Sequence, residues 1–169
     1  MFRLLKQIDR VIGAVLGPVV FAGMIALIGV ISVQIVSRVF FTSVSWTEEV
    51  ARFLLIWITF LGAALAYQQG RHIAVTLLCD SLPSGLRRAV TCTGLLVVIA
   101  FLVMLAMVGW HYMGLQSFQK SPSLRISMGL VYAVMPVCAV LMAALSALDL
   151  FRLLRGGETR RHAAPEAME

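Results

Sequence analysis

The residues of this sequence best suited to chemistry are two adjacent carboxylates, Glu48 and Glu49, which follow Ser45 and Trp46. Paired carboxylates can serve as general acid and base, provided that both reach the reacting atoms. Neighbouring residues on a helix point about 100° apart, so these two side chains diverge. We therefore expect no catalytic role for them, and we predict that they begin a helix and contact a partner.

The spacing of these residues predicts how that helix starts. Ser45 and Glu48 have the S-x-x-E spacing of a capping box, in which each side chain satisfies a free N–H of the first turn. Glu48 and Arg52 are four residues apart, a spacing that favours an ion pair on a helix. Trp46 is of the type that anchors at lipid headgroups.

Metal and thiol chemistry are not indicated. Cys79, Cys92 and Cys138 show no C-x-x-C spacing, and no metal-ligand cluster is apparent in the sequence. We expect no disulfide, no metal, no cofactor and no enzymatic activity.

The elements that must position these residues follow from composition. The 169 residues are 60% apolar and 13% charged. A soluble domain averages about 45–50% apolar and about 25% charged residues. This excludes an ordinary soluble enzyme and a disordered chain. The formal net charge of +6 would suit nucleic acid only as a basic patch with interleaved aromatics on a soluble surface, so we expect no nucleic-acid partner and a lipid bilayer instead.

Four long stretches contain no charged residue, and each is near or above the roughly 18–20 residues that cross a bilayer. We predict an all-α integral membrane protein with four transmembrane helices at about 11–37, 46–69, 86–118 and 126–149. These form a single domain over residues 1–155, and residues 156–169 form a flexible cytoplasmic tail.

The orientation follows from the Lys and Arg residues, which concentrate on the cytoplasmic side of membrane proteins. With both termini in the cytoplasm, ten of the 14 basic residues lie inside and four outside. The four outer ones are Arg38, Arg52, Lys120 and Arg125.

Residues 2–12 have an amphipathic pattern at helical spacing, with Leu4, Leu5 and Ile8 on one side and Arg3 and Lys6 on the other. Two interpretations remain open. The segment is an interfacial helix that lies along the inner membrane surface, or it forms the polar first turns of the first spanning helix.

The membrane core holds no Asp, Glu, Lys or Arg, the residues from which proton relays and substrate counter-charges are built. We infer that this chain alone is not an ion-coupled carrier. Pro18 and Pro136 each remove a helical hydrogen bond and should kink their helices. A strip of small residues, Thr59, Gly62, Ala63 and Ala66, would let another helix approach closely.

The order of several motifs resembles the small membrane subunit of tripartite ATP-independent periplasmic (TRAP) transporters, the DctQ type. The run from Ser45 to Phe53 continues through Gly62 to Gly70-Arg71-His72-Ile73-Ala74-Val75, and Tyr132 to Pro136 matches the Tyr-x-x-x-Pro of the family's fourth helix. The chain departs from the family at Thr76, where an acid is frequent.

The resemblance implies a scaffold subunit of the bacterial inner membrane that transports nothing alone. It implies two partners, namely a large multi-pass membrane subunit and a periplasmic binding protein that delivers an organic acid. On this basis Trp46, Glu48, Glu49 and Arg52 would order the outer edge, and Gly62 and Pro136 would support the scaffold contact. Lys120 and Arg125 are candidates for contacting the binding protein, and His72 would end the second helix on the cytoplasmic side.

Two alternatives remain at this stage. One is an accessory or assembly subunit of another membrane complex. The other is an autonomous homo-oligomeric four-helix transporter, which would be expected to carry a membrane-embedded carboxylate.

Overall fold

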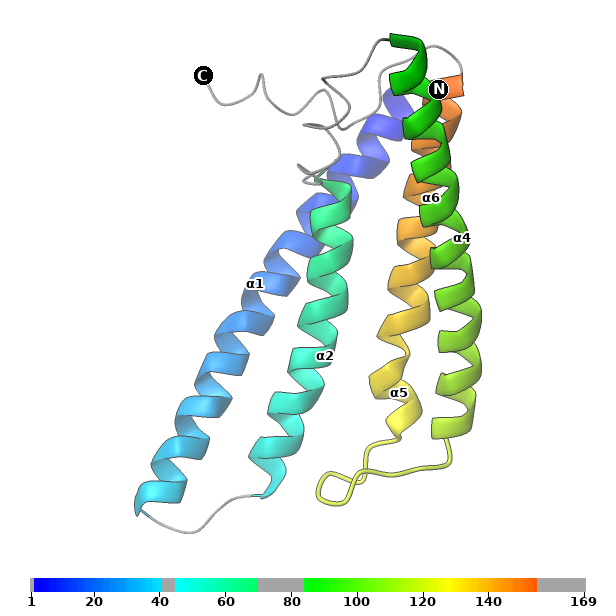
Figure 1. The fold of residues 1–169 in the computed structure, drawn as a ribbon. Helices are drawn as coiled ribbons and strands as arrows, with labels where there is room; N and C mark the ends of the chain where they lie inside the picture. The colour runs from blue at the N-terminus through cyan, green and yellow to red at the C-terminus, as the bar shows by residue number, and fades with distance from the viewer. Residues whose placement is uncertain (1, 41–44, 70–83, 155–169) are drawn as a thin grey trace, which may run out of the picture.

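The computed structural model describes residues 2–40, 45–69 and 84–154, and these ranges are built almost entirely from helices (Figure 1). The helices are α1 (Phe2–Phe40), α2 (Ser45–Gln68), α4 (Ser84–Gln116), α5 (Met128–Tyr132) and α6 (Val134–Leu154). The prediction of an all-α chain is confirmed.

Four segments within the described ranges are long and apolar enough to cross a membrane. They are Ile12–Phe40, Ser45–Gln68, Arg88–Gln116 and Met128–Phe151. Large apolar side chains on them face outward, among them Phe21, Ile28 and Met107, each more than 60% exposed. Such exposure suits hydrocarbon rather than water as the surrounding solvent, and the prediction of four helices long and apolar enough to span a membrane is confirmed.

The first helix is longer than predicted. α1 begins at Phe2 and runs without interruption to Phe40, past Pro18. The prediction that residues 2–12 are helical is confirmed, and the helix continues from them into the spanning segment Ile12–Phe40. Pro18 lies inside α1 and does not interrupt it.

The fourth span, Met128–Phe151, is interrupted at one residue, close to Pro136, where a kink was predicted. α5 ends at Tyr132 and α6 begins at Val134, with Ala133 between them. Pro136 lacks the N–H that would bond the carbonyl of Tyr132, and its ring crowds that carbonyl. The helix resumes with the bond from Val137 N–H to Ala133 O at 3.3 Å.

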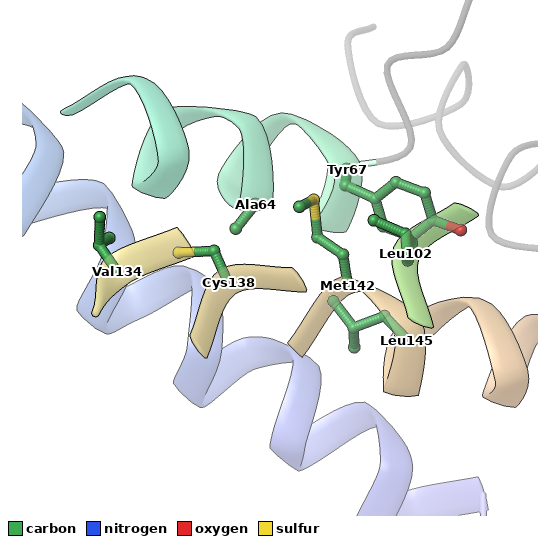
Figure 2. Close-up of a cluster of buried hydrophobic side chains, with 7 residues drawn as sticks. All are labelled: Ala64, Tyr67, Leu102, Val134, Cys138, Met142 and Leu145. Atoms are coloured by element: carbon green, nitrogen blue, oxygen red, sulfur yellow. The ribbon is translucent and has the colours of Figure 1, made fainter. Parts of the chain in front are cut away.

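The helices pack as two pairs, α1 with α2 and α4 with α6, and the pairs meet mainly where α2 contacts α6 (Figure 1). The core lies at that meeting, where side chains of α2, α4 and α6 converge (Figure 2). Its buried members are Ala64, Tyr67, Leu102, Val134, Cys138, Met142 and Leu145. No described side chain of α1 is buried, so α1 is the peripheral helix.

Two glycines allow close packing of the interrupted span. A Cβ added at Gly129 would lie 2.9 Å from the Cα of Ser117 and 3.0 Å from the carbonyl oxygen of Met113, both of them backbone atoms. A Cβ added at Gly109 would lie 3.3 Å from atoms of Met135 and Pro136. α5 and the start of α6 therefore rest directly on the last turns of α4.

Candidate interaction site

The first turn of α2 presents Glu48 and Arg52 on its exposed side. The Nη2 atom of Arg52 lies 3.1 Å from Oε1 of Glu48, and the two side chains are 63% and 65% exposed. The predicted ion pair is confirmed, and at this exposure it contributes about 0.3–0.5 kcal/mol. Trp46 is 45% exposed, in keeping with an anchor at the headgroups.

Glu49 has a different role from its neighbour. Its Oε1 accepts a hydrogen bond from the backbone N–H of Ser123 at 2.8 Å, and its Oε2 accepts one from the N–H of Leu124 at 3.0 Å. Hydrogen bonds to an ionised acceptor are roughly twice as strong as neutral ones. Glu49 thereby links the start of α2 to the α4–α5 loop, residues 117–127.

The expected capping box is not how these side chains are used. The hydroxyl of Ser45 forms a hydrogen bond of 3.3 Å with the hydroxyl of Ser123, and the carboxylate of Glu48 pairs with Arg52. Ser45 is already the first residue of α2, one position inside the place a cap requires. Ser45 therefore adds a second contact to the α4–α5 loop.

The α4–α5 loop has a defined hairpin form. Lys120 and Ser127 make an antiparallel bridge, Ser121 N–H donates to Ile126 O at 2.9 Å, and Met128 N–H donates to Gln119 O at 2.9 Å. Arg125 adopts a φ of 57°, a left-handed conformation that is uncommon for a residue with a Cβ.

The two predicted cations of this loop, Lys120 and Arg125, are exposed. Within the described ranges the one salt bridge is that of Glu48 and Arg52, so both cations remain available to a partner. Two apolar side chains of the loop, Leu124 and Ile126, face the other way and line a groove beside α1 and α2.

The small-residue strip of α2 is loosely covered in the described chain, and Ala63 and Ala66 line a hollow between α2 and α4. A Cβ added at Gly62 would meet nothing within 4 Å, and Ala63 and Ala66 are exposed. The Thr59 hydroxyl donates to Leu55 O of the same helix at 2.7 Å. Gly62 therefore leaves room on α2 for another helix to approach closely.

The remaining predicted positions lie elsewhere. Pro136 is buried beside Gly109 and supports the interrupted span. His72 lies outside the described residues. The structure thus brings the start of α2, with Glu49, and the α4–α5 loop, with Lys120 and Arg125, to one end of the molecule (Figure 1), while Gly62 lies further along α2.

Sequence reasoning missed three features nearer the other end, two of them contacts. Tyr67 of α2 and Ser146 of α6 form a buried hydrogen bond of 2.6 Å. Arg88 Nη2 donates to the carbonyls of Leu153 and Leu154 at 3.0 and 3.2 Å, which caps the C-terminus of α6.

The third missed feature is Asp149. α6 continues to Leu154, beyond the predicted end at 149, so Asp149 lies inside the helix and is 4% exposed. Its position at the edge of an uncharged stretch was the available signal. Among the described residues no group of three His, Cys, Asp or Glu side chains could hold a metal ion.

Comparison with known proteins places these features in a family. The model for "Tripartite ATP-independent periplasmic transporters, DctQ component" matches residues 27–156. The chain is 25% identical over 152 residues to the sialic acid TRAP transporter small permease protein SiaQ of Vibrio cholerae, covering 89% of this chain and 88% of that one.

Two further relatives are matched over smaller shares of their length. The isethionate TRAP transporter permease protein DctMQ of Oleidesulfovibrio alaskensis is 32% identical over 138 residues, 75% of this chain and 21% of that one. The ectoine TRAP transporter small permease protein TeaB of Halomonas elongata is 35% identical over 103 residues, 56% of this chain and 50% of that one. The chain thus spans about a fifth of the first and half of the second.

Proposed function

Because the chain belongs to the DctQ component family of tripartite ATP-independent periplasmic transporters, we propose that it is a scaffold subunit that extends a larger permease. The match over residues 27–156 carries this proposal. It is supported by the described spans, where large apolar side chains are exposed and a Cβ added at Gly62 would meet nothing within 4 Å.

The proposed main partner is a large multi-pass TRAP subunit. The DctQ-like region of the isethionate permease occupies 21% of a much longer chain, which supports the pairing of a small and a large component. Small residues on a helix let another helix approach closely in lipid, where packing rather than the hydrophobic effect drives the association of helices. Gly62, Ala63 and Ala66 are the surface proposed for that contact.

The proposed soluble partner is a periplasmic binding protein that delivers an organic acid. The names of the relatives support the substrate class, since isethionate and sialic acid are organic acids. Under the predicted orientation, with both termini in the cytoplasm, the α4–α5 loop faces the periplasm. Lys120 and Arg125 then lie where an acidic surface of the binding protein would dock.

Purification from mild detergent tests the scaffold proposal. We expect the tagged chain to retain a much larger hydrophobic protein, which mass spectrometry would identify as the permease encoded with it. The complex with its binding protein should move an organic acid in proteoliposomes, and the small chain alone should not. Solute movement by the chain on its own would overturn the proposal.

A further inference from the structure

Glu49 joins the two helix pairs at the end that carries the α4–α5 loop. The loop uses its own backbone for most of its hydrogen bonds, including Arg125 N–H to Ser121 O at 3.2 Å. The N–H groups of Ser123 and Leu124 at its tip instead go to the carboxylate of Glu49. The tip is therefore fixed from outside the loop by α2, with Glu49 bonding its backbone and Ser45 bonding the Ser123 hydroxyl.

The conformation held in this way is a demanding one. Arg125 has a φ of 57°, and left-handed backbone costs a residue with a Cβ roughly 1–2 kcal/mol. A strained backbone conformation of this kind persists only where contacts with the surrounding structure hold it in place. The bond of Arg125 N–H to Ser121 O and the bonds of the preceding two residues to Glu49 are those surroundings.

The loop has two distinct sides. Leu124 and Ile126 face α1 and α2, beside Phe53 and Trp57. Lys120 and Arg125 are exposed. Apolar contact holds the loop near the helices without fixing its orientation, because it is non-directional. The two bonds to Glu49 have defined geometry, so they set which way the cations point.

We propose that Glu49 is a positioning residue whose carboxylate holds the α4–α5 loop on α2 in the conformation that presents Lys120 and Arg125 to an acidic surface of the periplasmic binding protein. The second half of this inference rests on the proposed function. The first half concerns this chain alone and can be tested separately.

Glu48 provides a matched control one residue away. Glu49→Gln has nearly the same shape as glutamate but replaces one acceptor with an NH₂ donor, which would face a backbone N–H. Glu48→Gln makes the same chemical change at a side chain that contacts only Arg52 in the described structure. Glu49→Asp keeps the charge but shortens the side chain by one methylene. Its effect on the loop should therefore lie between those of Glu48→Gln and Glu49→Gln.

Disulfide cross-linking reports the position of the loop. The hydroxyl oxygens of Ser45 and Ser123 are 3.3 Å apart, so Ser45→Cys with Ser123→Cys places two thiols within reach of each other. In the assembled permease complex without its native cysteines, we expect Glu49→Gln to slow cross-linking by about tenfold or more, from the loss of charge-assisted bonds. Equal rates in the Glu48→Gln and Glu49→Gln variants would overturn the positioning role.

Uptake in proteoliposomes with the binding protein reports the docking. We expect Glu49→Gln to lower uptake at limiting binding protein and to leave saturated uptake close to normal. Oxidation of the cysteine pair should restore uptake, because the disulfide replaces the lost tie, and reduction should remove it again. Failure of the disulfide to restore uptake would overturn the claim that Glu49 acts by holding the loop.

Failure of the docking proposal can be told apart from failure of the positioning role of Glu49. Slower cross-linking with unchanged uptake at every binding-protein concentration would refute docking at this loop and leave Glu49 as its structural anchor. Lys120→Gln with Arg125→Gln provides the direct comparison, since it should weaken docking while the cross-linking rate stays normal. Normal docking in that variant would remove the binding-protein part of the proposal.

Discussion

Tyr67 and Ser146 join the two helix pairs through a hydrogen bond of 2.6 Å between their side-chain oxygens. Both residues are buried, Tyr67 at 9% and Ser146 at 0% exposure. Tyr67 lies with Met142 and Leu145 in the core shared by α2, α4 and α6 (Figure 2). This bond and the contact of Glu49 with the α4–α5 loop lie towards opposite ends of α2.

Removal of the Tyr67 hydroxyl should weaken the contact between the pairs. Hydrogen bonds between membrane helices average about 0.6 kcal/mol and reach about 1.7 kcal/mol. We expect Tyr67→Phe and Ser146→Ala each to lower the free energy of unfolding by that order, with a non-additive double variant. Ser32→Ala is the control, since Ser32 bonds Ile28 O of its own helix. Equal losses in all three single variants would contradict the interpretation.

Gly129 should tolerate no side chain. The Cβ of Gly129→Ala would lie 2.9 Å from a backbone atom of Ser117, so α5 must move away from α4, at a cost of about 1–3 kcal/mol. Gly114→Ala on α4 meets nothing within 4 Å and should be neutral or stabilising by up to about 1 kcal/mol. Thermal unfolding in detergent measures both, and a neutral Gly129→Ala would show that the contact is looser than described.

Gly62 should matter to the complex and not to the chain alone. A Cβ added at this position would meet nothing within 4 Å, so Gly62→Leu should leave expression and membrane insertion unchanged. It should reduce co-purification with the large subunit if α2 lies against that partner. Gly29→Leu on α1, where a Cβ also meets nothing within 4 Å, is the matched control. The same recovery of large subunit in both variants would place the interface elsewhere.

Arg88 should stabilise the end of α6 through hydrogen bonding and not through charge alone. Its guanidinium donates to two terminal carbonyls, an arrangement worth about 0.5–1.5 kcal/mol. Arg88→Ala should lower the unfolding temperature and increase hydrogen exchange in the last turn of α6. Arg88→Lys should recover only part of the loss, because a point charge lacks the fork of guanidinium donors. Full recovery with lysine would assign the effect to charge.

The helices could be predicted because charge is expensive in a bilayer, so the gaps between charged residues mark the spans. The interruption at Ala133 could be anticipated from Pro136, whose chemistry frees the carbonyl of Tyr132. The interruption itself required the structure, since Pro18 lacks an N–H as well and α1 continues past it.

The site was only partly predictable. The sequence indicated that Glu48 and Glu49 begin a helix, but it predicted the same role for both, namely contact with a partner. Their roles differ because Glu49 meets backbone N–H groups of Ser123 and Leu124, more than 70 residues away. A backbone donor is present at nearly every residue, so no residue type at 123 or 124 could reveal the contact. Tyr67 and Ser146 did carry a signal, as polar groups in apolar spans.

The pairing of the helices has a consequence for how the protein is made. α1 and α2 are consecutive spans, as are α4 and the α5–α6 segment, and each pair packs mainly on itself. Each can therefore form a helical hairpin as soon as its second span enters the bilayer, before the rest of the chain has been synthesised. The docking of one hairpin on the other is then the last step of folding, and the few polar contacts between them select the correct alignment.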